Sequence, residues 1–199
     1  MSRLLDVIDA CGADVQDFPF EDEELDGMAL GHVEFEDCSF TSCSFANVLA
    51  ERISFERCTF VDCDFSNAQL PTSFWRDCTV SASRLVGTNL THGYLVRTTF
   101  KDCAASYVNL AESKIEQVTF RGCDLREASL SQMRTKRLRL EDCDLTRAEA
   151  FRTRLSGVDL SSCIITTLRV SDTFAELRGA KLGIDQAPEI MALLGIKLV

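Results

Sequence analysis

Several features that would indicate a membrane-bound or exported protein are missing from this chain of 199 residues. No stretch approaches the roughly 18 consecutive apolar residues that a membrane-spanning helix needs. The opening segment, MSRLLDVIDACGADVQ, lacks the basic region, apolar run and small-residue cleavage site of a secretory signal. We therefore expect a cytoplasmic protein whose ten cysteines are reduced thiols.

Histidine is scarce, and the motifs of common enzyme chemistry are absent. The sequence has only His32 and His92, and it contains no GxSxG, HExxH, Walker A or GxGxxG pattern. Its cysteines never show the close C-x-x-C spacing that zinc sites favour. Two Asp-Cys-Asp segments, at 62–64 and 142–144, could suggest a cation site, but we interpret their carboxylates as part of a solvated face. We expect a non-enzymatic protein with no metal site and no cofactor.

Positive charge is also in short supply. The chain has 31 acidic and 21 basic residues, which gives a net charge of −10. Such a chain is a poor direct partner for nucleic acid or for an anionic membrane, although it permits a basic protein partner. Its 46% hydrophobic content excludes a disordered acidic tail.

What the sequence has instead is a repeat of five residues. Nine of the ten cysteines fall at positions whose number ends in 3 or 8. Between Phe20 and Val170, nearly every fifth residue is Phe, Leu, Ile, Val or Trp, and a smaller residue stands two positions earlier. This period matches neither a helix (about 3.6) nor a flat strand (about 2). It predicts a solenoid in which each pentad is one short side with two inward side chains.

Residues twenty positions apart fall into columns of similar type. One column contains Phe20, Phe40, Phe60, Phe100 and Phe120. Another contains Cys43, Cys63, Cys103, Cys123, Cys143 and Cys163. This clustering supports coils of four pentads. We interpret the cysteines as inward packing, because side chains stacked about 4.8 Å apart point the same way and do not favour disulfides.

Segments such as CSFTS, CSFAN, CDFSN and CDLRE resemble the pentapeptide-repeat family, whose motif is commonly written A(D/N)Lxx. The resemblance covers residues 18–175 and implies an all-β fold, a right-handed quadrilateral parallel β-helix of about eight coils. We expect an N-terminal cap segment over 1–17 and a C-terminal capping or dimerisation helix and tail over 176–199. Within the N-terminal cap, the sequence predicts a short helix over 2–11.

The C-terminal segment LRGAKLGIDQAPEIMALLGIKLV is similar to the C-terminus of the Qnr-like and MfpA-like members of that family. In those relatives this end joins two rods, which implies a homodimer. The expected interface consists of Ile190, Met191, Leu193, Leu194, Ile196 and Leu198. The alternative is a cap that buries its own apolar face against the rod.

Negative charge is concentrated on one side of the expected coils. The side formed by residues 21–25, 41–45 and their equivalents up to 161–165 has a net charge of −8. Its outward carboxylates, here called the acidic stripe, are Asp22, Glu24, Asp62, Asp64, Asp102, Asp124, Glu141, Asp142 and Asp144. Qnr-like and MfpA-like proteins are regarded as DNA mimics that bind type II topoisomerases and counter quinolones. The resemblance therefore implies that the stripe binds DNA gyrase or topoisomerase IV.

Charge is also uneven along the chain. Residues 1–80 contain 17 acids and 4 bases, whereas residues 81–199 contain 14 acids and 17 bases. A basic patch near the expected dimer centre comprises Arg134, Lys136, Arg137, Arg139, Arg147, Arg152 and Arg154. A DNA mimic would need acids there. The sequence therefore leaves open a general protein-interaction scaffold without topoisomerase activity, in which the stripe serves solubility.

Overall fold

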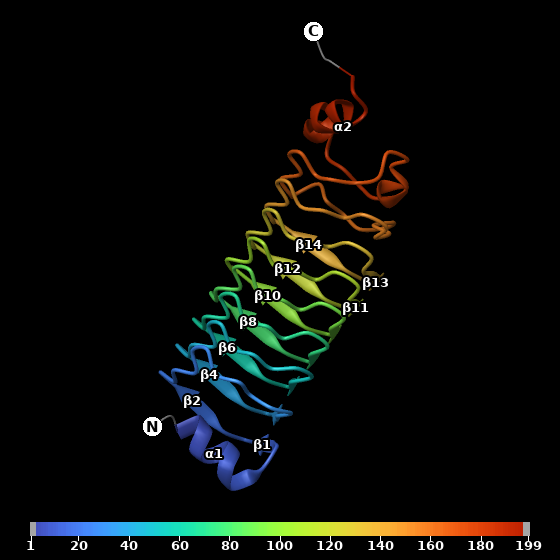
Figure 1. Cartoon of the computed structure of the whole chain (residues 1–199). Helices are drawn as coiled ribbons and strands as arrows, with labels where there is room; N and C mark the ends of the chain where they lie inside the picture. Colours follow the sequence, from blue (N-terminus) through green and yellow to red (C-terminus); the bar gives the residue numbers. More distant parts are fainter. Residues whose placement is uncertain (1–2, 197–199) are drawn as a thin grey trace.

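The computed structural model describes residues 3–196 and shows an elongated parallel β-solenoid (Figure 1). Each coil advances by twenty residues, because Phe40 pairs in parallel register with both Phe20 and Phe60. The chain winds from helix α1 (Arg3–Cys11) at one end to helix α2 (Ala187–Leu193) at the other. The predicted coil of four pentads is confirmed.

Two of the four sides are parallel sheets. The first sheet consists of β1 (Asp14–Gln16), β3 (Glu34–Glu36), β5 (Ser54–Glu56), β7 (Phe74–Arg76), β9 (Tyr94–Val96), β11 (Lys114–Glu116) and β13 (Arg134–Lys136). The second sheet consists of β2 (Pro19–Glu21), β4 (Ser39–Thr41), β6 (Thr59–Val61), β8 (Thr79–Ser81), β10 (Thr99–Lys101), β12 (Thr119–Arg121) and β14 (Arg139–Glu141). The other two sides are held by single parallel bridges, which run from Glu24 to Ile164 and from Ala29 to Arg169.

The predicted count of about eight coils is slightly too high. Seven strands in each sheet correspond to about six full turns. Beyond β14 the chain keeps bridges on two sides but forms no further strand among the described residues. The bridge from Asp159 to Lys181 spans 22 residues instead of twenty, so two additional residues interrupt the regular register at this end.

The corners of the coil depend on left-handed backbone conformations. Non-glycine residues such as Asp62 (φ 55°) and Asn67 (φ 56°) recur at the last position before the inward cysteine or its equivalent. Asp and Asn tolerate this region better than most side chains. The backbone N–H at such a corner donates to the next coil, as Asp62 does to the carbonyl of Ser81 at 3.1 Å. The strain of each corner is thus offset by pairing between coils.

Stacked aromatic side chains fill the N-terminal half of the interior. The rings of Phe40 and Phe60 lie 4.7 Å apart and nearly parallel, and those of Phe45 and Phe65 lie 4.8 Å apart. Trp75 is buried, and its Nε1 donates to Ser73 Oγ at 3.0 Å. The indole N–H, which is the polar group of this side chain, therefore has the hydrogen-bond partner that a buried donor needs.

The nine repeat cysteines are free and buried, as the repeat predicted. The Sγ of Cys43 lies 3.5 Å from the carbonyl oxygen of Phe20, in the preceding coil, and 3.4 Å from that of Thr41. At the equivalent position Thr98 donates its hydroxyl to the carbonyls of Trp75 and Val96. The position therefore favours a small side chain that can also donate a hydrogen bond, a role that hydrophobic patterning alone did not reveal.

We expect these nine thiols to be unreactive in the folded protein. Contact with the thiol of Cys123 raises the pKa of Cys143 to about 11, contact with Cys163 partly opposes this, and burial adds to the rise. The thiolate of Cys143, the reactive form, is then rare at about pH 8. Contact with a neighbouring thiol instead lowers the pKa of Cys43, Cys78 and Cys103, so these thiols are protected by burial, which keeps reagents out. Ellman's reagent should label the nine only as the protein unfolds in denaturant. Rapid labelling of several thiols in native buffer would contradict this expectation.

Both ends of the solenoid are covered. Helix α1 confirms the helix predicted over 2–11 and packs against β1, with Leu4 fully buried. The repeat already includes β1, which begins at Asp14, four residues before its expected start. At the other end, the 3-10 helices η1 (Ala175–Leu177) and η2 (Ile184–Gln186) precede α2. No helix within residues 3–196 is long and apolar enough to cross a membrane.

Candidate interaction surfaces

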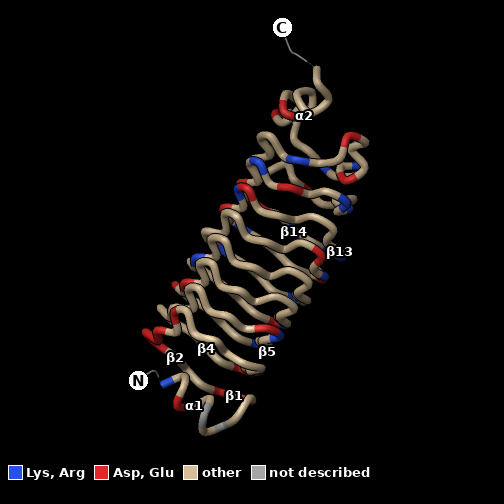
Figure 2. The backbone as a smooth tube through the Cα atoms, in the orientation of Figure 1, with Lys and Arg blue, Asp and Glu red and all other residues tan. Residues whose placement is uncertain are grey.

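The acidic stripe lies along one side of the rod. Its central ladder of bridges passes through Glu24, Asp64, Asp124 and Asp144. The corner column beside this ladder carries Asp22, Asp62, Asp102 and Asp142, one in every second coil and therefore about 10 Å apart. In Figure 2, acidic positions gather around β2, near the N-terminal end.

Small residues separate the aspartates of the corner column. The intervening positions are Ser42, Ala82 and Gly122. A Cβ atom added at Gly122 would lie only 2.5 Å from Oδ1 of Asp102, so the carboxylate of Asp102 leans onto the next coil. The carboxylate of Asp62 instead accepts a hydrogen bond from Ser42 Oγ of the preceding coil at 3.3 Å. This alternation spaces the charges at twice the rise of one coil.

More than half of the predicted acidic stripe is paired within the chain. The ion pairs are Asp64 with Arg84 (3.9 Å), Asp102 with Lys101 (3.8 Å), Asp124 with Arg126 (2.7 Å), Glu141 with Arg121 (2.5 Å) and Asp144 with Arg126 (3.9 Å). The hydrogen bond from Arg126 lowers the pKa of Asp124. Asp22, Glu24, Asp62 and Asp142 are exposed and form no ion pair within residues 3–196. These four, here called the unpaired carboxylates, are the part of the stripe whose charge is not neutralised by a neighbouring base among the described residues.

The basic patch is only partly neutralised. Lys136 pairs with Glu116 at 2.5 Å, and Arg147 pairs with Glu127 at 3.5 Å. The other five members are exposed and form no ion pair among the described residues: Arg134, Arg137, Arg139, Arg152 and Arg154. Arg137 and Arg139 line a shallow depression of about 280 Å³ on one corner of the rod. The C-terminal half therefore presents a positive surface of its own.

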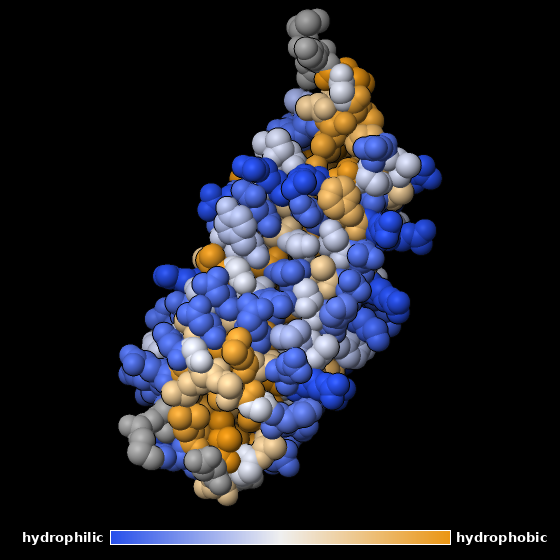
Figure 3. Space-filling view, in the orientation of Figure 1, coloured by the Kyte–Doolittle hydropathy of each residue, from blue (hydrophilic) through white to orange (hydrophobic). Residues whose placement is uncertain are grey.

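The residues of the predicted dimer interface differ in how far they are buried against the rod. Ile190 packs against the core, and Met191 and Leu193 are half-buried. Leu194 and Ile196 are each 51% exposed, whereas Leu198 lies outside the described residues. Ile184, in η2, is 95% exposed and was not predicted. Figure 3 shows an apolar area at this end of the rod, so the cap does not bury all of its own apolar surface.

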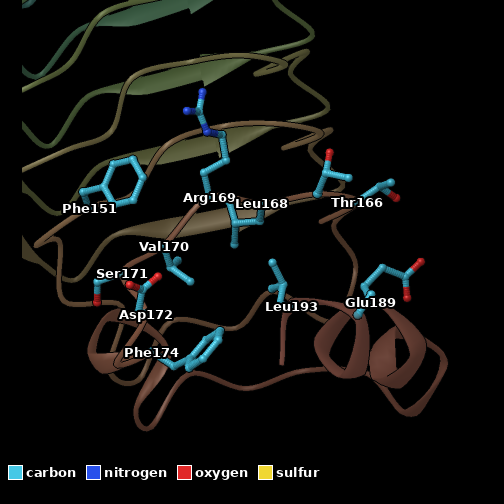
Figure 4. A pocket seen from close by; sticks show the side chains of 12 residues that line it. Phe151, Thr166, Leu168, Arg169, Val170, Ser171, Asp172, Phe174, Glu189 and Leu193 are labelled. Atoms are coloured by element: carbon cyan, nitrogen blue, oxygen red, sulfur yellow. The ribbon is translucent and has the colours of Figure 1, made fainter. Parts of the chain in front are cut away.

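An apolar pocket of about 510 Å³ lies between the last coils and α2 (Figure 4). Phe151, Leu168 and Val170 contribute to it from the last coils, and Phe174 and Leu193 contribute from the C-terminal segment. The pocket is continuous with the expected dimer interface through Leu193.

The described residues do not form a metal site. No group of three or more His, Cys, Asp or Glu side chains within the described part of the chain is arranged to hold a metal ion. His92 lies 3.6 Å from Glu112 on the surface. The Asp-Cys-Asp segments point their cysteines into the core.

Comparisons with known proteins agree with this architecture. A model described as "Pentapeptide repeat region" matches residues 73–150, and one described as "SV2A/B/C luminal domain" matches residues 15–85. No curated protein sequence matches the chain. The structure thus defines a parallel β-solenoid built from five-residue repeats. Residues 73–150 of this solenoid match the pentapeptide-repeat model, and the coils on either side of them continue the same parallel pairing at twenty-residue spacing.

Solved structures of the same kind are similar at low sequence identity. A trypsin-treated form of QnrB1, a plasmid-mediated fluoroquinolone resistance protein, is 18% identical, with 94% of this chain and 99% of that chain covered and a TM-score of 0.37. HetL, a pentapeptide repeat protein involved in heterocyst differentiation regulation from the cyanobacterium Nostoc sp. strain PCC 7120, is 15% identical, with 90% and 91% covered and a TM-score of 0.30. A pentapeptide repeat protein from the Arabidopsis thaliana thylakoid lumen is 19% identical, with 68% and 86% covered and a TM-score of 0.29.

Proposed function

We propose that this rod is a non-enzymatic, cytoplasmic binding protein whose acidic stripe occupies a DNA-binding surface of a type II topoisomerase, DNA gyrase or topoisomerase IV, and thereby protects the enzyme from quinolones. The observation that carries the proposal is the set of four unpaired carboxylates on one side of a rigid rod. A protein surface that binds DNA is attracted to an ordered row of negative charge. The similarity of the C-terminal sequence to Qnr-like proteins supports this choice of partner.

The geometry of the stripe determines how strongly it should bind. Asp22 and Asp142 are six coils apart, which places about 29 Å between them. Duplex DNA carries one charge per about 1.7 Å, so the stripe is a much sparser polyanion. We therefore expect weaker binding than that of DNA, with a smaller dependence on salt. The carboxylates are held by backbone that is already paired between coils, so they need little reordering on binding.

Dimerisation through the C-terminus forms part of the proposal. Exposed Ile184, Leu194 and Ile196 are apolar side chains at the end of the rod that a second copy could cover. End-to-end pairing would align two rods and extend the array of carboxylates. The homodimer thus provides a longer surface for a topoisomerase than one chain does.

A second candidate function is a protein-interaction scaffold without topoisomerase activity. The basic patch favours it, because five arginines without ion pairs in the described structure lie toward the expected dimer centre. A DNA-binding surface of a topoisomerase that docked at the expected dimer centre would meet positive charge instead of negative charge.

A gyrase supercoiling assay, titrated with and without a quinolone, tests the two functions. We expect inhibition or protection at micromolar protein. The informative variant neutralises the unpaired carboxylates by Asp22→Asn, Glu24→Gln, Asp62→Asn and Asp142→Asn, since asparagine keeps the left-handed corners. It should lose at least about tenfold in activity, because each lost phosphate-like contact weakens an electrostatic interface.

The matched control removes the same number of charges from carboxylates that are already paired: Asp64→Asn, Asp124→Asn, Glu141→Gln and Asp144→Asn. It should change the effect less than about threefold, because those charges are already screened by their partners. No inhibition and no protection by the unmodified protein would refute the topoisomerase proposal and leave the scaffold. Equal losses in both variants would refute the role of the unpaired carboxylates.

A further inference from the structure

The first sheet carries a graded order of outward side chains on the side of the rod opposite the acidic stripe. The first residue of each strand points outward, and we call these residues, with the equivalent residue of the next coil, the graded column. Its members are Asp14, Glu34, Ser54, Phe74, Tyr94, Lys114, Arg134 and Arg154. The column thus changes from acidic at the N-terminal end, through aromatic at the middle, to basic at the C-terminal end.

The charges at both ends of the graded column are uncompensated. Asp14, Glu34, Arg134 and Arg154 are exposed, and within residues 3–196 none of them forms an ion pair. The neighbouring outward column, formed by the third residue of each strand, is different. There Arg76 pairs with Glu56 at 3.7 Å, Lys136 pairs with Glu116, and Glu36 pairs with Arg57. Free charge on this sheet is therefore confined to the graded column.

The middle of the graded column is an aromatic pair. The ring centroids of Phe74 and Tyr94 lie 5.7 Å apart. Cζ of Arg76 lies 4.8 Å from the centroid of Phe74, and Nζ of Lys114 lies 5.9 Å from that of Tyr94. Tyr94 is 38% exposed, and Phe74 is half-buried. The face therefore has an apolar centre between two ends of opposite charge.

The graded column of one rod is electrostatically complementary to the same column of a second rod that runs in the opposite direction. If two rods pack antiparallel with these sheets face to face, a two-fold axis passes between β7 and β9. Glu34 then lies opposite Arg134 of the second copy, and Asp14 lies opposite Arg154. Phe74 meets Tyr94 of the second copy at the centre. A parallel arrangement would instead place like charges opposite each other, which is unfavourable.

We propose that the first sheet is a self-association surface, on which a second copy of this chain binds antiparallel. An isologous two-fold contact requires a surface that complements itself, and the graded column meets that requirement at its aromatic centre and at its two charged ends. Because the acidic stripe lies on the opposite side, such a pair would present two stripes on its outer faces. The inference is therefore independent of the topoisomerase proposal and of the C-terminal dimer.

The size of the surface limits its affinity. The sheet is about 30 Å long and about 10 Å wide, so each copy would bury roughly 300 Å² plus the flanking corners. Stable complexes bury about 800 Å² per partner. We therefore expect a weak association that is seen at high protein concentration and is lost at high salt.

Charge reversal followed by sedimentation velocity tests the proposal. The full-length chain should self-associate as its concentration rises toward about 1 mM, since small interfaces bind weakly. Glu34→Lys and Arg134→Glu should each weaken that association at least about tenfold, because each places like charges opposite each other. The double variant should return to within about threefold of the unmodified chain, since the pair is then restored with its signs exchanged. Arg139→Glu is the matched control and should have little effect, because this exposed arginine points outward from β14 on the second sheet.

Two further measurements separate this contact from the C-terminal dimer. The same series is repeated in a chain carrying Leu194→Asp and Ile196→Asp, where the rescue should persist. Oxidative cross-linking of Ser54→Cys chains mixed with differently tagged Lys114→Cys chains should give a mixed product. The proposal is overturned if the double variant is not rescued, if concentration produces no association in this background, or if Ser54→Cys chains cross-link only to each other.

Discussion

Replacing Phe60 by alanine should lower the free energy of unfolding by about 3–5 kcal/mol, the range for a large aromatic side chain removed from a packed core. Phe60 is fully buried. Its ring stacks on Phe40 at 4.7 Å, meets Phe55 edge-on at 5.1 Å and lies 5.5 Å from Trp75. Because the surrounding backbone is fixed by pairing with coils on both sides, it cannot collapse into the space that the ring leaves.

The next residue provides the matched control. Val61 follows Phe60 in β6 but points outward and is 44% exposed, so Val61→Ala should cost less than about 0.5 kcal/mol. Urea unfolding followed by circular dichroism and by Trp75 fluorescence measures both variants. Since each coil contacts only its neighbours, a rod that divides at this coil would show different urea midpoints for circular dichroism and for Trp75 fluorescence in Phe60→Ala. A loss below about 1 kcal/mol would show that the stack tolerates a cavity.

Replacing Gln186 by leucine should open the C-terminal end of the rod. The side chain is 5% exposed, and Nε2 donates to the carbonyls of Leu160 at 2.8 Å and Cys163 at 2.6 Å. Its Oε1 accepts from the N–H of Gly183 at 2.8 Å. Leucine would leave three backbone groups without these partners, at about 1–3 kcal/mol for each group that stays buried. We expect a total loss of at least about 3 kcal/mol in the local stability of this end.

Hydrogen exchange resolved by peptide measures that loss. Exchange should accelerate in residues 155–190 and stay unchanged in the N-terminal coils, because stability in a solenoid is largely local. Gln16→Leu, on the exposed face of β1, makes the same chemical change without a buried partner and should have little effect. Unchanged protection around Leu160 in Gln186→Leu would contradict the role of this side chain in holding the last coils closed through its hydrogen bonds.

The period of five was sufficient to predict the core. Which side chains point inward depends only on their place in the pentad, so the stack of Phe40 on Phe60 and the buried cysteines followed from spacing. The C-terminal end could not be predicted in this way. Two additional residues before Lys181 shift the register, and the five-residue pattern contains no signal for such an insertion. The roles of Gln186 and Glu176 as buried hydrogen-bonding groups arise in that irregular segment.

The acidic stripe was predicted less well than the core. Residue type and side were sufficient to place its carboxylates, but not to show which are already paired. Opposite charges twenty residues apart in the sequence are a signal that predicts such ion pairs. Arg97 pairs with Asp77, and Arg121 pairs with Glu141, in this way. The pairing of Arg126 with Asp124 is different, because it joins residues two apart on one coil and depends on side-chain conformation.

The twenty-residue coil fixes how the length of the rod and the positions of its side chains depend on the number of residues. Inserting twenty residues would lengthen the rod by about 4.8 Å and leave every later side chain on its own side. Inserting five would rotate everything that follows by a quarter turn and would move an acidic stripe onto a neighbouring side. Because aspartate stands at this corner in every second coil, inserting forty residues of the same pattern would continue the row of charges at its present spacing.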